Sequence, residues 1–273
     1  MMMTQQALWQ HVNRVLVAKC ISELQYEECL VPEGGADCWP LNLASGARYR
    51  FFAWQSLWGQ LRLNAESLMR NGKPVDSAAQ FFIDAQGELG MDDIVLANLL
   101  EECAQTLQGD LQSWWLRQSV SARQMAQMDV DVMQPYLDGH PKAVLNKGRL
   151  GWGADELARY APEYNQPLRL RWVAVARPHC VVGLEQDSDL DGVIKSAMSA
   201  AEYQSLRSRV DCLNGEWILL PVHPWQWQHK IRIHFQAWIA RGELVDLGEA
   251  GCRYLPLQSI RTLANLDFPQ APN

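Results

Sequence analysis

The sequence of 273 residues has no apolar run of the length that crosses a bilayer. Near the N-terminus, Asn13 and Arg14 interrupt the apolar residues before these form the core of a signal peptide. Acidic and basic residues are interspersed, and the formal net charge of −7 disfavours binding to a phosphate backbone. We therefore expect a cytoplasmic protein that binds neither membrane nor nucleic acid.

The signatures of several common sites are also missing. The sequence has no C-x-x-C pair and no H-E-x-x-H arrangement, so we expect no protein-ligated metal centre. It has neither G-x-x-x-x-G-K-[ST] nor G-x-G-x-x-G, which argues against a P-loop and a Rossmann turn. The odd number and scatter of the cysteines predict free thiols packed as small apolar side chains. They are Cys20, Cys29, Cys38, Cys103, Cys180, Cys212 and Cys252.

The residues that are present predict a globular protein with a large core, since 48% are hydrophobic and 20% are charged. Hydrophobic periodicity predicts an α+β fold, in which helices precede a mostly antiparallel sheet with flanking helices. The composition changes near Pro135, which indicates two parts, residues 1–135 and 136–273. Helices are expected over residues 5–30, 92–118, 190–212 and 228–242, and strands over 48–54, 58–63, 168–176, 217–220 and 251–257.

Three polar segments combine charged or hydroxyl residues with glycine or proline, and we call them the first, second and third islands. The first covers residues 139–153, where several glycines accompany Lys147 and Arg149. Glycine allows close approach of the backbone to a ligand, and the cations supply donors for phosphate or carboxylate oxygens. The same residues fit a basic surface loop whose glycines only make turns, and this reading is slightly favoured by the residues alone.

The second island, residues 221–228, holds His223 between two prolines at the end of an apolar strand. This placement suits a positioned donor or base, although a single histidine is more often structural. The tryptophans beside it are expected in the core. In the third island, residues 258–262, Ser259 and Arg261 share one face of an extended segment next to Thr262. Hydroxyls and a guanidinium form an anion clamp, but S-x-R-T alone is not specific.

The order and spacing of the islands are more informative than any one of them. H-P-K-x-x-x-N-K-G-R-x-G-W-G, P-V-H-P-W-Q-W-Q and Q-S-x-R-T-L resemble the IucA/IucC family of siderophore synthetases, which work independently of non-ribosomal peptide synthetases. The segments 12–19 and 22–27 resemble the aerobactin-synthase branch of that family, and 156–164 and 247–249 add to the likeness. The resemblance covers essentially the whole chain and corresponds to the N-terminal portion of the family.

The resemblance implies a cupped-hand enzyme with thumb, fingers and palm regions that is a homodimer at full length. Residues 1–135 then form a thumb-like helical region with a β-hairpin, and 136–273 form the beginning of the nucleotide-binding fingers region. The C-terminal palm has no counterpart here. We therefore expect this chain to be inactive by itself.

The resemblance also implies an acid–amine ligase that uses ATP and Mg²⁺. A carboxylate of citrate or succinyl type is adenylated, and an amine or hydroxylamine displaces AMP to give an amide or hydroxamate. By motif, the residues expected to contact ATP are Lys147, Arg149, Ser259, Arg261 and Thr262. His140, Lys147 and Arg261 are the expected catalytic residues, and His140 and His223 are expected near the substrate.

Several alternatives stay open. Hydroxamate chemistry is favoured, with citrate plus a hydroxylated, acylated lysine or a self-joined hydroxy-succinyl diamine as the competing substrate classes. A second hypothesis is a non-catalytic remnant that binds nucleotide or pairs with an intact synthetase subunit. A third is a folded domain without a ligand. The general base is not assigned.

Overall fold

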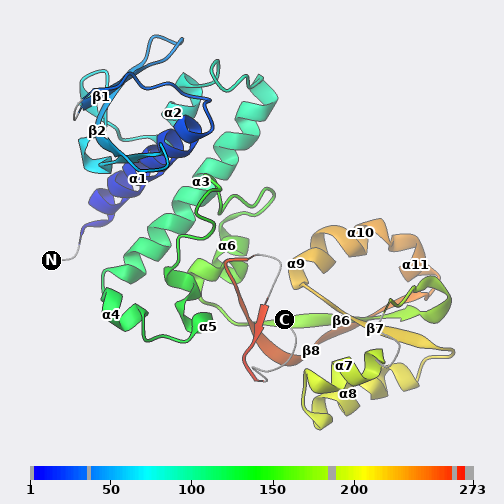
Figure 1. The fold of residues 1–273 in the computed structure, drawn as a ribbon. Coiled ribbons are helices and arrows are strands. Elements are labelled where there is room, and N and C mark those ends of the chain that lie inside the picture. The colour runs from blue at the N-terminus through cyan, green and yellow to red at the C-terminus, as the bar shows by residue number, and fades with distance from the viewer. Residues whose placement is uncertain (1–2, 36–37, 184–188, 260–262, 268–273) are drawn as a thin grey trace. The chain divides into compact units, whose positions relative to one another are not determined.

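The computed structural model describes residues 3–35, 38–183, 189–259 and 263–267 (Figure 1). The chain divides into two compact units, Met1–Leu157 and Ala158–Asn273, which we call the first and second units. This division falls later in the chain than the change of composition near Pro135, because the first island packs within the first unit. None of the helices in the described ranges is long and apolar enough to span a bilayer.

The first unit is built around two long helices that the sequence predicts. Helix α1 (Gln5–Tyr26) begins where the Thr4 hydroxyl accepts the backbone N–H of Ala7 at 3.2 Å. Helix α3 (Asp93–Arg117) begins where the Asp92 carboxylate accepts the N–H of Val95 at 2.8 Å. Both side chains satisfy a backbone donor that has no partner within the helix, so they fix where each helix starts.

The first unit also contains a five-stranded antiparallel sheet. The predicted hairpin is confirmed, because β2 (Arg48–Gln55) pairs with β3 (Leu61–Leu63). The sheet extends beyond the predicted hairpin, since β1 (Cys38–Asn42), β4 (Met69–Arg70) and β5 (Lys73–Pro74) join it. Strand β1 carries a proline at its centre, and the other two are very short, so none gives a clear strand pattern.

Alternation along β2 directs one face of this sheet into the core. Tyr49, Phe51 and Ala53 are buried, whereas the residues between them are exposed. The buried face packs against α1, α3 and α2 (Ala78–Asp84). The Asp84 carboxylate lies beneath it and accepts hydrogen bonds from Tyr49 Oη at 2.6 Å and from Arg70 Nε at 2.6 Å.

The second unit is a four-stranded antiparallel sheet in the order β7-β6-β8-β9. Strand β6 (Leu168–Ala176) matches its prediction, and β7 (Trp217–Val222) begins where predicted. The strand expected over 251–257 is only the last part of β8 (Leu244–Pro256). Strand β9 (Leu263–Asn265) pairs with the end of β8, and the third island lies between these two strands in the sequence.

Both faces of this sheet are covered by helices (Figure 1). Trp172 and Ala174 of β6 pack towards α7 (Leu190–Ser196) and α8 (Ala200–Asp211). Val173 and Val175 pack towards the opposite set, which includes Trp227 and Trp238. That set consists of α9 (Pro224–Gln226), the π-helix Trp227–Ile231, α10 (Arg232–His234) and α11 (Gln236–Ala240).

The single helix expected over 190–212 is in fact two helices. Ser199 interrupts it, because its hydroxyl accepts the N–H of Glu202 while the Glu202 carboxylate accepts the N–H of Ser199. This reciprocal pair starts a new helix. The remaining short elements are α4 (Ala122–Met125), α5 (Val130–Met133), α6 (Ala154–Tyr160) and the 3-10 helices Ala65–Ser67, Gln134–Tyr136, Pro162–Tyr164 and Arg177–His179.

The cysteines differ in burial. Cys20, Cys103 and Cys252 are buried, as expected for thiols packed as small apolar side chains. Burial raises the pKa of the Cys103 thiol to about 12 and that of Cys252 to about 11. Cys29 and Cys212 are exposed.

Candidate functional site

The first island presents one imidazole to solvent. His140 is exposed, and its Nδ1 accepts the backbone N–H groups of Lys142 at 3.2 Å and Ala143 at 3.1 Å. Because Nδ1 is an acceptor, the proton of the neutral ring is on Nε2. His140 can therefore donate a hydrogen bond from Nε2 to a ligand oxygen.

Two cations of the first island, Lys147 and Arg149, are buried in the first unit. Lys147 is fully buried, and its Nζ donates to Asp110 Oδ1 at 2.7 Å and to Ser113 Oγ at 3.4 Å. Burial raises the pKa of the Asp110 carboxyl above its ordinary value, and the nearby Lys147 ammonium offsets part of that effect. Arg149 is also buried, with its guanidinium 5.7 Å from the Trp152 ring. Their roles as phosphate contacts stay predictions.

Gly148 brings the first island into close contact with helix α3. A Cβ built at Gly148 would lie 2.7 Å from Glu102 Cβ and 3.2 Å from Glu102 Cα. No ordinary side chain fits at such distances. The lack of a side chain at this position therefore serves packing of the loop on the helix.

The second island places His223 at the end of β7. Its Nδ1 accepts the N–H of Trp225 at 3.2 Å, and its ring meets that of Tyr160 edge to face, with centroids 4.8 Å apart. Burial lowers the pKa of His223 to about 4, and the positive charge of Arg159 adds to the shift. Trp227 is in the core as expected, whereas Trp225 is only partly buried and stacks on His229.

The lowered pKa predicts an acid-sensitive second unit. The unfolded chain binds a proton at His223 near pH 6.5, whereas the folded protein resists it until about pH 4. The contribution of His223 to stability is therefore complete above pH 6.5 and is lost as the pH falls towards 4. His223→Asn keeps an acceptor for the Trp225 N–H. We expect the melting temperature of this variant to change less with pH between 6.5 and 4 than that of the wild type. An equally steep loss in the variant would contradict the assignment.

The third island begins directly after β8. Gln258 Nε2 donates to Glu163 Oε1 at 3.1 Å, and Glu163 is fully buried. Ser259 is exposed. Arg261 and Thr262 lie outside the described residues.

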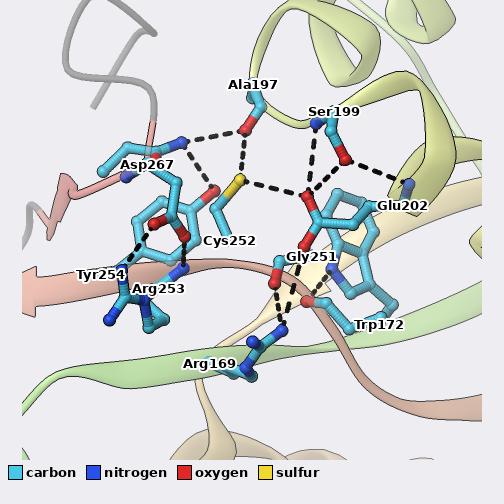
Figure 2. A network of polar contacts seen from close by, with 12 residues as sticks. Arg169, Trp172, Ala197, Ser199, Glu202, Gly251, Cys252, Arg253, Tyr254 and Asp267 are labelled. Atoms are coloured by element: carbon cyan, nitrogen blue, oxygen red, sulfur yellow. Dashed lines mark hydrogen bonds and ion pairs between the residues drawn. The ribbon is translucent and has the colours of Figure 1, made fainter.

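Figure 2 shows the polar contacts that hold the base of the β8–β9 hairpin. Asn265 Nδ2 and Cys252 Sγ both donate to the carbonyl oxygen of Ala197, at 2.9 Å and 3.2 Å. The Arg253 guanidinium pairs with Asp267 at 2.8 Å across the two strands. The chain segments that precede and follow the third island are thus held by these contacts.

The segment 160–163 connects the second and third islands. Tyr160 packs on His223, and Glu163 binds Gln258, so two islands that are distant in sequence are held by neighbouring residues of the second unit. Residues 156–164 contribute to the family resemblance, but the sequence predicts no role in the site for Tyr160 or Glu163. The buried charge of Glu163 gives no signal in sequence, because a glutamate before a tyrosine and an asparagine looks like an exposed turn.

These geometries supply two imidazoles with Nε2 free of the backbone contacts made by Nδ1, and an exposed hydroxyl. Within the described part of the chain, no group of three or more His, Cys, Asp or Glu side chains could hold a metal ion. Within its own unit, each of the imidazoles and the hydroxyl can donate a hydrogen bond to an oxygen of an anionic ligand.

Comparison with known proteins identifies the class. The fold, with its helices and antiparallel sheets, matches the solved aerobactin synthetase IucC of Klebsiella pneumoniae with a TM-score of 0.88 and 40% identity, covering 95% of this chain and 48% of that one. The IucA / IucC family model matches residues 129–273. The chain belongs to the IucA/IucC family, whose characterised relatives are siderophore synthetases.

Two curated relatives show the range of similarity. The chain is 40% identical to the aerobactin synthase of Escherichia coli over 94% of its own length and 44% of that protein. It is 31% identical to the putrebactin synthase of a Shewanella species, over 96% of its own length and 43% of that protein. The chain therefore spans about half the length of the curated relatives it matches.

Proposed function

We propose that the protein acts in siderophore biosynthesis as an ATP- and Mg²⁺-dependent acid–amine ligase. It adenylates a carboxylate of citrate or succinyl type and joins it to an amine or hydroxylamine, with release of pyrophosphate and AMP. The observation that carries the proposal is the joint support of the second and third islands by residues 160–163. In a family of siderophore synthetases, that arrangement favours one ligand site over two unrelated loops.

The third island is the proposed phosphate-binding segment. Ser259 is exposed, and the strands before and after the island are paired up to Pro256 and Leu263. Hydroxyl and guanidinium donors suit phosphate oxygens. We assign phosphate contacts to Ser259, Arg261 and Thr262 on their residue types and on the motif that they form in the sequence.

The histidines are the proposed substrate-side groups. His140 and His223 are each oriented by backbone N–H groups at Nδ1, so each keeps Nε2–H for an oxygen acceptor. A carboxylate is a poor electrophile, and ATP supplies the leaving group that activates it. Donors that neutralise charge on the reacting groups then lower the barrier.

The regional assignments are part of the same proposal. The first unit corresponds to a thumb-like region, and the second to the beginning of the nucleotide-binding fingers region of a dimeric whole protein. The higher identity to aerobactin synthase than to putrebactin synthase favours an aerobactin-type substrate pair over a self-joined diamine.

Binding of Mg-ATP and release of pyrophosphate test the proposal. We expect saturating Mg-ATP to raise the melting temperature, since a ligand at 100 times its Kd stabilises the native state by about 2.7 kcal/mol. Arg261→Ala should weaken binding by about tenfold through loss of a charge-assisted hydrogen bond. The exposed Arg232→Ala is the matched control.

Each outcome distinguishes a hypothesis. Pyrophosphate release with citrate, or with an N-hydroxy-N-succinyl diamine, supports adenylation and identifies the substrate class. Binding of Mg-ATP without pyrophosphate release is the result expected of a chain that binds nucleotide but is inactive by itself, whether as part of a ligase or as a remnant. A melting temperature unchanged by Mg-ATP contradicts nucleotide binding by this chain.

A further inference from the structure

One face of helix α3 holds the middle of the first island. Glu102 contacts Gly148, Gln105 binds the backbone of Arg149, and Asp110 binds Lys147. Positions 102, 105 and 106, 109 and 110, and 113 recur at the spacing of one helical face. The consecutive loop residues 147–149 therefore all contact the same surface.

Gln105 binds two backbone groups of the island with one amide. Its Oε1 accepts the N–H of Arg149, and its Nε2 donates to the carbonyl oxygen of Trp152 at 3.0 Å. Gln105 is buried, so these contacts are shielded from water. This part of the loop has little freedom to move away from the helix.

Helix α1 holds the other end of the island. Lys19 Nζ donates to the carbonyl oxygens of His140 at 3.3 Å and Ala143 at 2.7 Å. Lys142 Nζ pairs with Glu23 at 3.0 Å. The backbone of the segment is thus bound from inside, while the imidazole of His140 is exposed.

Lys147 and Asp110 form the most buried charge pair of this arrangement. The Lys147 side chain has 0% exposure and that of Asp110 has 17%, so their contact is nearly removed from water. An ammonium in this position is bonded to the helix and is not presented to a ligand. The buried ammonium of Lys147 forms its ion pair with Asp110, which lies outside the three islands.

We propose that Asp110 is a positioning residue which, through its ion pair with Lys147, fixes the first island so that His140 presents its Nε2–H to the ligand. The proposal rests on the proposed function for the identity of that ligand, a nucleotide or acyl carboxylate. Lys147 then affects ligand binding only through the position of the loop. If Lys147 contacted phosphate directly, ligand binding would instead depend on its positive charge.

Substitution of one or both partners separates these roles. Removing one charge leaves the other buried without its partner, whereas replacing both with apolar side chains of similar volume is often neutral or stabilising. The variants are Asp110→Leu, Lys147→Met and the double variant. Lys73→Met, at an exposed lysine of β5, is the matched control.

Hydrogen–deuterium exchange of the segment 139–153 is the first readout, because it needs no ligand. We expect amide exchange there to be about tenfold faster in each single variant and to return to the wild-type rate in the double variant. Under the same conditions the Kd for Mg-ATP, measured by calorimetry, should rise in the single variants and recover in the double variant. Lys73→Met should change neither.

The alternatives give different results. If the double variant regains slow exchange but not Mg-ATP binding, Lys147 contacts the ligand and the proposal is overturned. If exchange in 139–153 is unchanged in every variant, the pair does not position the loop, which also overturns it. If the wild-type chain does not bind Mg-ATP, the proposed function fails, while the exchange data still decide the positioning of the loop by Asp110.

Discussion

Replacing Asp84 with asparagine is expected to lower the free energy of unfolding of the first unit by about 3 kcal/mol. The Asp84 side chain is 6% exposed, and it accepts hydrogen bonds from Tyr49, Arg70 and Gln80. Asparagine has the same shape but no charge, and its NH₂ group would face the donors of Tyr49, Arg70 or Gln80, which need an acceptor. Because the donors of Tyr49 and Arg70 then lack a charged acceptor, the substitution lowers the free energy of unfolding by the full cost of leaving buried polar groups poorly paired.

The measurement is urea unfolding followed by far-UV circular dichroism, with thermal melting as a second probe. A decrease of about 10 °C in melting temperature accompanies the predicted loss. Asp76→Asn, an exposed aspartate close in sequence, is the matched control and should be neutral. Equal stability of the two variants would show that the Asp84 cluster does not stabilise the unit.

The same aspartate makes a prediction for acid. Burial alone would raise the pKa of Asp84, but hydrogen bonds from Arg70, Tyr49 and Gln80 outweigh it and leave that pKa below its ordinary value. Its stabilising effect is thus present above the unfolded-state pKa, at roughly pH 4, and is lost as the pH falls through the folded-state pKa. Asp84→Asn should remove this part of the acid unfolding.

Gly148→Ala is expected to lower the free energy of unfolding by about 2 kcal/mol, because an added methyl group has no space beside α3. The new Cβ would lie 2.7 Å from Glu102 Cβ, 2.9 Å from Glu102 Cγ and 3.2 Å from Glu102 Cα. Rotation of the Glu102 side chain relieves only the contact to Cγ, because the positions of Cα and Cβ are set by the helix backbone. The loop must therefore shift away from α3.

The result is checked by denaturant unfolding of Gly148→Ala beside Gly87→Ala. A Cβ at Gly87 meets nothing within 4 Å, so the control should be neutral or slightly stabilising. If both alanine variants unfold alike, the close packing of the first island on α3 is not maintained in solution.

Regular elements of the fold were accessible from sequence, because their patterns are local. The sequence predicts helix α3 from an aspartate cap followed by a long stretch of helical periodicity. It predicts β6 from alternating side chains and a run of apolar, partly β-branched residues. Strand β1 was missed, because Pro40 at its centre hides the pattern and its pairing with β2 is set by tertiary contacts. The start of β8 was missed for a similar reason, since Gly248 and Gly251 interrupt its alternation.

The candidate site shows the same limit. Sequence located His140 and His223 and predicted a restrained ring for the latter, which the structure gives by contacts with Tyr160 and Trp225. It did not reveal that Lys147 is buried, because a lysine between glycine and asparagine normally reads as exposed. Only a long-range partner, Asp110, makes that burial possible.

The thiols also determine how the protein should be handled. Those of Cys20, Cys103 and Cys252 are buried with raised pKa values, so few are deprotonated near neutral pH. Cys29 in the first unit and Cys212 in the second are exposed. Storage without a reductant therefore favours disulfides between molecules at these two positions, and a covalent dimer formed in this way must be distinguished from native association.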